Sequence, residues 1–167
     1  MTASTAAPPL DVAQVALDGT VAIEASAGTG KTHTITRLYL RLVVEKALPV
    51  DRILVVTYTV AATAELRSRI RDLLASVAGG LAGRGLEDEL VATLVARVGR
   101  ELARRRVEDA LRGFDQAAIF TIHGFCQRVL AEKAFESAMP FRSELLADET
   151  DLLREIAEAV RVSGERE

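Results

Sequence analysis

A short glycine-rich stretch that ends in a lysine and a threonine is the strongest chemical signal in this sequence. Residues 25–32 read ASAGTGKT, which matches the phosphate-loop pattern G-x-x-x-x-G-K-[ST] except at its first glycine. Small residues let backbone N–H groups close around phosphate oxygens, a lysine reaches the β- and γ-phosphates, and a hydroxyl binds Mg²⁺. The pattern therefore predicts a nucleotide site, and the alternative is a glycine-rich turn between a strand and a helix. The residues of the predicted site are Ala25, Ser26, Ala27, Gly28, Thr29, Gly30 and the two catalytic positions, Lys31 and Thr32, with Thr32 also the Mg²⁺ ligand.

A second segment places hydroxyl and aromatic side chains where a predicted strand meets a predicted helix. Thr57, Tyr58 and Thr59 follow the apolar residues 53–56. In open α/β sheets, ligands gather at the carboxyl ends of the strands. Tyr58 could therefore stack on a base while the threonines bond phosphates. The alternative is that Tyr58 is a core aromatic and that the threonines cap the following helix.

A third segment, residues 120–126, reads FTIHGFC and forms another predicted strand-to-helix turn. Thr121 and His123 stand near the end of that strand, although a lone histidine in such a place is more often structural than a ligand. Cys126 is expected to be a small buried residue. No partner base accompanies it, which argues against a cysteine enzyme.

Hydrophobic periodicity predicts the elements that must position these side chains. Residues 20–24 (TVAIE) and 52–58 (RILVVTY) are short apolar runs typical of buried strands. Residues 31–46 and 61–78 carry apolar positions at helical spacing. The order of strand, loop, helix, strand and helix is a βαβα unit, which implies an α/β fold with a parallel sheet.

The remainder of the chain reads as helical, with one more strand. Residues 79–85 (GGLAGRG) predict a flexible linker, and the charged residues 86–113 predict helices of an inserted subdomain. The expected organisation is a loose N-terminus (1–14), a P-loop βαβα portion (15–78), a helical insertion (79–116), a strand–helix segment of the same domain (117–138) and the truncated start of a further helical subdomain (139–167).

Composition excludes several classes of protein. The 167 residues are 49% apolar and 27% charged, as in soluble globular domains, and no apolar run is long enough to span a membrane. The N-terminus lacks the basic and apolar regions of a signal peptide, and a single cysteine fits a reducing cytoplasm. A net charge of −3 argues against a general nucleic-acid coat, but it leaves room for a local basic groove.

Taken together, the three segments resemble a known family. EASAGTGKT, VVTYTVAATAELRSRI and FTIHGFCQRVL occur in the order and at the spacing of motif I, motif Ia and the following DNA-contact motif of UvrD-like superfamily 1 helicases. Within that family, the resemblance is closest to the RecB subunits of bacterial RecBCD helicase–nucleases. It covers residues 15–150 and implies a P-loop, RecA-like parallel sheet with a helical insertion.

The resemblance also implies a function and its residues. The loop at residues 25–32 would bind ATP and Mg²⁺, and the family's adenine-contact glutamine would fall near Gln14. Hydrolysis would drive translocation along single-stranded DNA in double-strand break repair and recombination, with RecC-like and RecD-like partners in the full-length protein. The residues expected along the DNA track are Thr57, Tyr58, Thr59, Ala61, Thr121 and His123.

Two features expected of a complete helicase are missing from the sequence. No Asp-Glu pair follows an apolar strand, since ADE at residues 147–149 has no such strand before it, and no later arginine motif is present. We therefore expect an N-terminal piece of a helicase, whether a truncated product, a gene fragment or an incomplete sequence, that is inactive and marginally stable alone. The alternatives are a small-substrate P-loop NTPase or kinase, and a non-catalytic nucleotide- or DNA-binding regulatory module.

Overall fold

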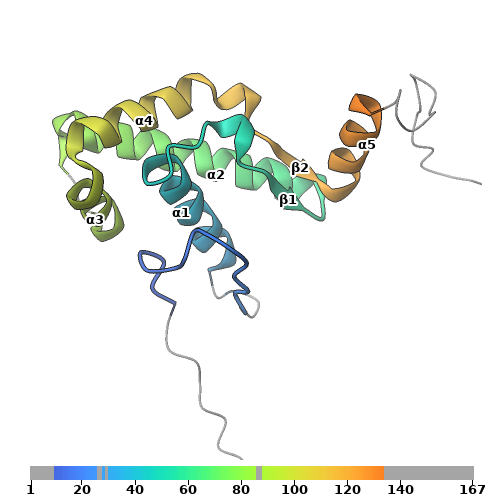
Figure 1. Ribbon diagram of the computed structural model, residues 1–167, viewed down its shortest axis with the longest axis horizontal. Coiled ribbons are helices and arrows are strands. Elements are labelled where there is room, and N and C mark those ends of the chain that lie inside the picture. Colours follow the sequence, from blue (N-terminus) through green and yellow to red (C-terminus); the bar gives the residue numbers. More distant parts are fainter. Residues whose placement is uncertain (1–9, 26–27, 29, 86–87, 134–167) are drawn as a thin grey trace, which may run out of the picture. The chain divides into compact units, whose positions relative to one another are not determined.

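The computed structural model describes residues 10–25, 28, 30–85 and 88–133. Within these residues the chain is a mixed α/β fragment with five α-helices and two parallel strands, consistent with part of a P-loop RecA-like domain (Figure 1). The predicted fold class is therefore confirmed. The elements in chain order are α1 (Lys31–Val44), β1 (Val55–Thr57), α2 (Val60–Gly79), α3 (Glu89–Val98), α4 (Arg100–Arg112), β2 (Ile119–Thr121) and α5 (Ile122–Glu132).

Polar caps and glycines set where the helices begin. The Thr59 side chain accepts a hydrogen bond from the Ala62 N–H at 3.1 Å and so caps α2. Asp88 does the same for the first N–H groups of α3. Gly99, at φ 87°, separates α3 from α4, because a side chain there would disfavour this left-handed backbone. The predicted helical region 86–113 is thus two helices.

The two strands form a parallel pair whose carboxyl ends are level. Thr57 of β1 lies opposite Thr121 of β2 in the register. The Arg67 guanidinium of α2 donates to the carbonyl oxygen of Ala117 at 2.9 Å, just before β2. This contact and the packing of α2 against both strands hold the strand ends beside the start of α2.

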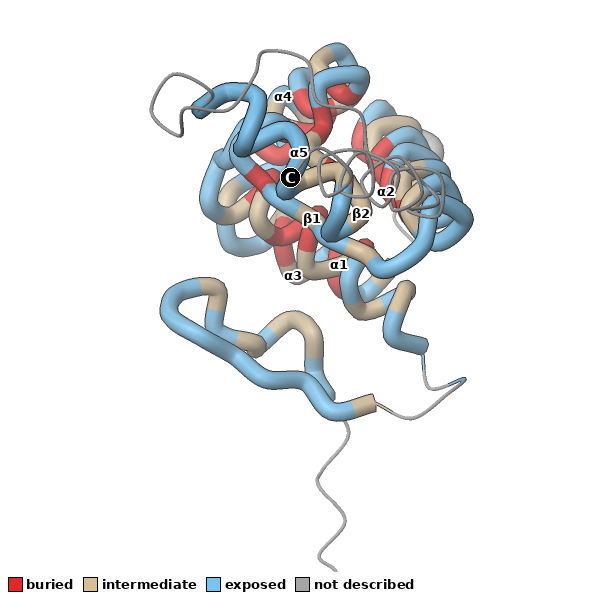
Figure 2. The backbone as a smooth tube through the Cα atoms, turned by 90° about the vertical axis from the view of Figure 1, so that its right-hand side faces the viewer, coloured by how far each residue is buried: buried red, intermediate tan, exposed pale blue. Residues whose placement is uncertain are grey.

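One hydrophobic core joins the helices to the sheet. Ile70, Leu74 and Val107 are fully buried, and they belong to a cluster that includes residues of α1, α2, α3, α4 and β2. Figure 2 shows buried segments on each of the helices α1 to α4. Tyr39 is 2% exposed, and burial raises the pKa of its hydroxyl to about 12. The helices after residue 85 therefore pack into the same core as α1.

Three local predictions differ from the structure. Residues 20–24 form no strand, and Val21 and Ile23 are 46% and 38% exposed, because no neighbouring strand among the described residues pairs with them. The strand predicted at 52–58 shortens to Val55–Thr57, with Val56 on an exposed face. The expected linker at 79–85 continues the helical backbone of α2 as far as a kink at Gly83, whose φ is 115°, and Leu81 within it is buried in the core.

The chain divides after Phe125 into two compact units, Met1–Phe125 and Cys126–Glu167. Cys126, expected to be buried, is exposed. Within the second unit, Arg128 pairs with Glu132 one turn later on α5 at 2.8 Å. The start of a further helical subdomain, predicted at residues 139–167, lies outside the described residues. Across the described part of the chain we find no helix with the length and apolarity that membrane crossing requires.

Candidate nucleotide site and strand-end surface

Two glycines with left-handed backbones shape the loop before α1. Gly28 has a φ of 77° and Gly30, the residue before the helix, has a φ of 85°. Residues with a side chain rarely adopt these backbone conformations. This explains the glycines that the sequence has at both positions, although the phosphate-loop pattern itself requires only Gly30. Ser26, Ala27 and Thr29 lie outside the described residues. The helix that follows points its N-terminal N–H groups toward the loop, an arrangement that favours anions.

The side chain of Lys31 links the end of the loop to its beginning. The Lys31 ammonium donates a hydrogen bond to the carbonyl oxygen of Ala25 at 3.0 Å, which brings the start of the loop over the start of α1. Among the described non-glycine residues only Ala47 has a positive φ, so Ala25 is unstrained where the pattern has glycine. Thr32 is half-buried in the first turn of α1. The described residues of the loop thus fit a phosphate cradle.

At the end of β1, the hydroxyl groups are engaged with the start of α2. The Thr57 hydroxyl lies 2.5 Å from the Thr63 hydroxyl and donates to the Thr59 carbonyl at 3.1 Å. Thr59 caps the helix, so the capping alternative is confirmed for this residue. Tyr58 is 79% exposed, which rules out a core aromatic. Its ring faces solvent at the carboxyl end of the strand.

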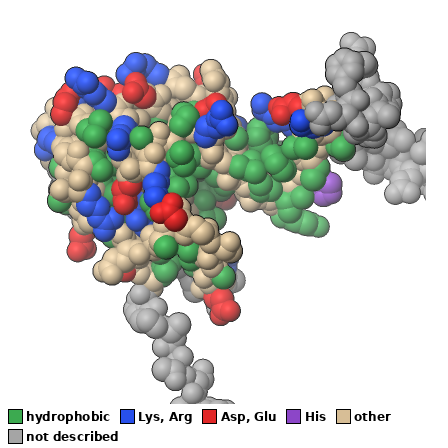
Figure 3. All heavy atoms as spheres, viewed as in Figure 1, with side chains coloured by type: hydrophobic (Ala, Val, Ile, Leu, Met, Phe, Trp, Pro, Cys, Tyr) green, Lys and Arg blue, Asp and Glu red, His purple; other side chains and the backbone are tan. Residues whose placement is uncertain are grey.

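At the end of β2, a similar turn starts α5. The Thr121 hydroxyl accepts a hydrogen bond from the Gly124 N–H at 3.0 Å, and His123 is exposed. Because Thr57 and Thr121 are paired in the register, the two predicted DNA segments end at the same edge of the sheet. Figure 3 shows hydrophobic side chains gathered over the strands, whereas charged groups of both signs are interspersed over the helices. Exposed residues around these strand ends are Val56, Tyr58, Val60, Ala61, Ile122 and His123.

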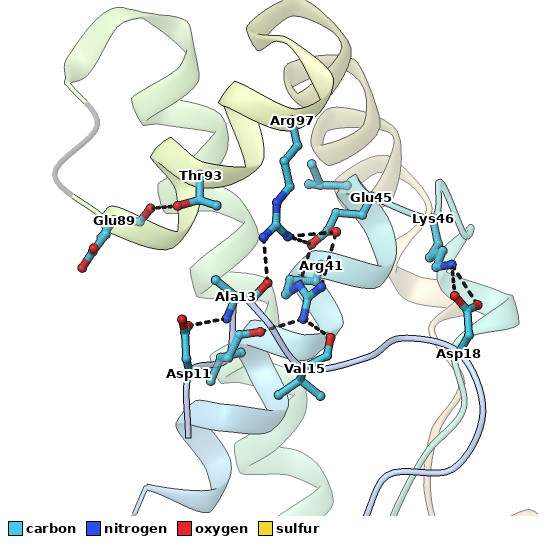
Figure 4. Close-up of polar contacts among 12 residues, drawn as sticks. Asp11, Ala13, Val15, Asp18, Arg41, Glu45, Lys46, Glu89, Thr93 and Arg97 are labelled. Carbon is cyan, nitrogen blue, oxygen red and sulfur yellow. Dashed lines mark hydrogen bonds and ion pairs between the residues drawn. The ribbon is translucent and has the colours of Figure 1, made fainter. Parts of the chain in front are cut away.

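A charged cluster that the sequence analysis missed fastens the N-terminal segment to α1 (Figure 4). Arg41, only 4% exposed, donates to the carbonyl oxygens of Val12 and Val15 at 2.7 and 2.6 Å. Its Nε also donates to the Glu45 carboxylate at 2.5 Å. The available signal was an arginine and a glutamate four residues apart at the C-terminal end of α1, where the neighbouring residues are mostly apolar.

An arginine from α3 completes this cluster. Arg97 donates to Glu45 at 3.1 Å and to the carbonyl oxygen of Ala13 at 2.9 Å (Figure 4). We call Arg41, Glu45 and Arg97 the clamp. The Gln14 amide, near which the resemblance places the adenine contact, donates to Asp11 at 2.8 Å. The clamp therefore ties the backbone on either side of Gln14 to two helices.

A cavity of about 520 Å³ opens between the N-terminal segment, α1 and α3. His33 and Arg37 line it from the first two turns of α1, close in sequence to Lys31. The Arg37 guanidinium donates to His33 at 2.8 Å and pairs with Asp88 at the start of α3 at 2.5 Å. The volume of the cavity is in the range of pockets that bind small molecules. Among the described residues no group of three or more His, Cys, Asp or Glu side chains could hold a metal ion.

Acid is expected to weaken the clamp. Burial by itself raises the pKa of Glu45, but the hydrogen bond from Arg41 and the charges of Arg41 and Arg97 outweigh it and hold the pKa below its ordinary value. The ionised carboxylate therefore stabilises the fold above the ordinary glutamate pKa of about 4.3, and this contribution is lost as pH falls through the lower folded-state value. We expect the melting-temperature difference between the native chain and Glu45→Gln to be largest above about pH 5 and to shrink in acid.

Thermal melts across this pH range would test the expectation. The matched control is Glu65→Gln, which breaks another arginine–glutamate pair four residues apart on a helix, but one that is more than half exposed. Such exposed pairs contribute little, so this variant should melt like the native chain at every pH. A Glu45→Gln difference that stays constant with pH would contradict the assignment.

Comparisons with known proteins agree with the sequence pattern. Residues 9–166 match the UvrD/REP helicase N-terminal domain. The chain is 44% identical over 160 residues to the RecBCD enzyme subunit RecB of Escherichia coli K12, covering 90% of this chain and 14% of the relative. It is 39% identical over 160 residues to RecB of Haemophilus influenzae (87% and 13%) and 39% over 142 residues to RecB of Mycobacterium tuberculosis H37Rv (83% and 13%). The chain thus spans 13–14% of the length of these curated relatives.

Proposed function

Because the chain belongs to the UvrD/REP helicase family, whose members are ATP-dependent DNA helicases, we propose that it is the ATP-binding portion of a RecB-like helicase. Its role would be in DNA double-strand break repair and recombination. The observation that carries the proposal is the closed loop before α1, where Lys31 reaches across to the Ala25 carbonyl. The chain's 44% identity to a RecB subunit supports the choice of branch within the family.

In this proposal the loop binds the triphosphate of ATP with its magnesium ion. Lys31 would exchange the Ala25 carbonyl for phosphate oxygens, which accept a stronger, charge-assisted hydrogen bond. The Thr32 hydroxyl would bind Mg²⁺, and the N–H groups between residues 25 and 30 would surround the phosphates. Gln14 is the proposed adenine contact. When bound, ATP supplies the phosphoryl transfer that drives strand translocation in the full-length protein.

Single-stranded DNA would follow the carboxyl ends of the strands. The exposed Tyr58 ring would stack on a base, and Val60 would add apolar contact beside it. Thr57, Thr59, Ala61, Thr121 and His123 would line the same path. The full-length protein would work with RecC-like and RecD-like subunits in the cytoplasm, as the name of the relatives indicates an assembly of such subunits.

Removal of the Tyr58 ring tests the DNA path. Because each base stacked on an aromatic side chain contributes about 1–3 kcal/mol, we expect Tyr58→Ala to weaken binding of an unstructured oligonucleotide by about 5-fold to 150-fold. Tyr58→Phe keeps the ring and should bind within about 2-fold of the native chain. Fluorescence anisotropy over a range of salt concentrations is the measurement, since phosphate contacts make affinity fall with salt. Equal loss in both variants would contradict a stacking role.

A second candidate, a non-catalytic module that binds nucleotide or DNA and regulates a partner, uses the same surfaces. Hydrolysis of ATP with and without single-stranded DNA separates the two. The sequence offers no Asp-Glu pair behind an apolar strand, so we expect this chain alone to bind ATP without DNA-stimulated turnover. Stimulated turnover that disappears in Lys31→Ala would show that the chain, as an oligomer, supplies the missing groups itself.

A further inference from the structure

We propose that Arg41, Glu45 and Arg97 are positioning residues that fix segment 11–15 as a wall of the cavity beside the phosphate loop and thereby set the affinity for the base end of the nucleotide (Figure 4). The inference rests on the proposed ATP site and deepens it. None of the three residues belongs to the loop or follows from its pattern. They lie at the far end of α1 and on α3.

The burial of Arg41 is the first step of the argument. A guanidinium that is 4% exposed loses most of its hydration, which is costly unless its N–H groups find acceptors. The Glu45 carboxylate accepts a hydrogen bond from the Nε of Arg41. The carbonyl oxygens of Val12 and Val15 both accept from its Nη1. The N–H groups of Arg41 are satisfied in this way only while the N-terminal segment keeps its present backbone path. The segment and the arginine therefore order each other.

The second step is the link to α3. Glu45 accepts from Arg41 and Arg97 together, and Arg97 also donates to the carbonyl oxygen of Ala13. The backbone is thus held at Val12, Ala13 and Val15, on both sides of Gln14. Because three peptide groups within four residues are held by hydrogen bonds, the backbone of Gln14, which lines the cavity, has little freedom to move.

The third step is the position of the cavity along α1. His33 and Arg37 line it, two and six residues after Lys31. At a rise of about 1.5 Å per residue these positions lie about 3 Å and about 9 Å along the helix from the lysine. A nucleotide held at the loop by its phosphates has its base within reach of this cavity. A loosened wall would then lower the affinity for the base but leave the affinity for the phosphates.

The test compares a nucleotide with its phosphate part alone. Titration calorimetry on the full chain measures the Kd for Mg-ATP and for Mg-tripolyphosphate, and circular dichroism checks that each variant is folded. We expect Arg41→Met to weaken ATP by about 10-fold and to leave tripolyphosphate within about 2-fold. Arg97→Met, at the more exposed edge of the clamp, should act in the same direction with a smaller effect, and it serves as the second variant if Arg41→Met does not fold.

The matched control is Arg106→Met. Arg106 also donates to a backbone carbonyl, that of Val44, but it comes from α4, and this hydrogen bond does not involve the N-terminal segment. It should leave both affinities unchanged. Equal weakening of ATP and tripolyphosphate by the clamp variants, or no weakening of ATP, would overturn the inference. Failure of the native chain to bind tripolyphosphate at all would overturn the proposed ATP site itself, and with it this inference.

Discussion

Replacing Lys31 by alanine is expected to lower the affinity of the chain for Mg-ATP by about 10-fold to 150-fold. The Lys31 ammonium donates a hydrogen bond to the Ala25 carbonyl, and phosphate oxygens would replace this carbonyl as acceptors when a nucleotide binds. Hydrogen bonds to charged groups contribute about 1.5–3 kcal/mol, which corresponds to that range of Kd. Because the lost contact is with the phosphates, tripolyphosphate should weaken by the same factor as ATP. Titration calorimetry with both ligands measures the effect.

This pattern of loss distinguishes the loop from the clamp. Lys31→Ala is expected to weaken the binding of both ATP and tripolyphosphate. The clamp variants are expected to weaken only the binding of ATP, which carries a base. Lys133→Ala is the matched control, because it removes a lysine far along the chain from the loop. An unchanged Kd in Lys31→Ala would show that the stretch at residues 25–32 is a structural turn, which is the alternative its sequence leaves open.

The features that follow from local sequence are those that could be predicted. The helix after the loop begins at Lys31, because Gly30 provides the left-handed residue that precedes it. The second helix begins beside Thr59, whose side chain caps it. The parallel pairing of the strands follows from the helical connection between them, and it places Thr57 and Thr121 at one edge. The two helix signals lie within a few residues of the helix starts that they determine, and the strand pairing follows from the order of the elements along the chain.

The features that depend on distant partners could not be predicted. Residues 20–24 have the composition of a strand, but a strand needs a neighbour, and the described residues supply none for Val21 and Ile23. The glycines at 79–85 suggest flexibility, yet Leu81 is 3% exposed because α2 and α4 meet around it. Arg97 reaches Ala13, 84 residues away in the sequence. No spacing rule connects such positions.

Substitution of Ile70 by alanine is expected to destabilise the whole first unit. Its side chain is fully buried on α2, the helix that packs against α1, α4 and both strands. Loss of that much buried apolar volume costs about 2–5 kcal/mol, a large part of the roughly 5–15 kcal/mol by which native domains are stable. We expect a marked fall in melting temperature and weaker binding of both ATP and DNA. Ile70→Val should cost only about 0.5–1.5 kcal/mol, and Leu102→Ala, at a position 43% exposed, less than about 0.5 kcal/mol.

Hydrogen exchange in the same variant asks whether the helices after residue 85 are a separate body, as their sequence predicts. Leu94 of α3 and Val107 of α4 share one core with Leu40 of α1, the helix that carries the phosphate loop. Loss of Ile70 should therefore lower amide protection in α1, α3 and α4 together, because cooperative units unfold as their shared core is lost. Protection that falls in α3 and α4 but persists in α1 would instead assign them to an insertion with its own stability. The nucleotide site would then still meet that insertion at Arg97, which contacts the N-terminal segment, and at Asp88, which pairs with Arg37.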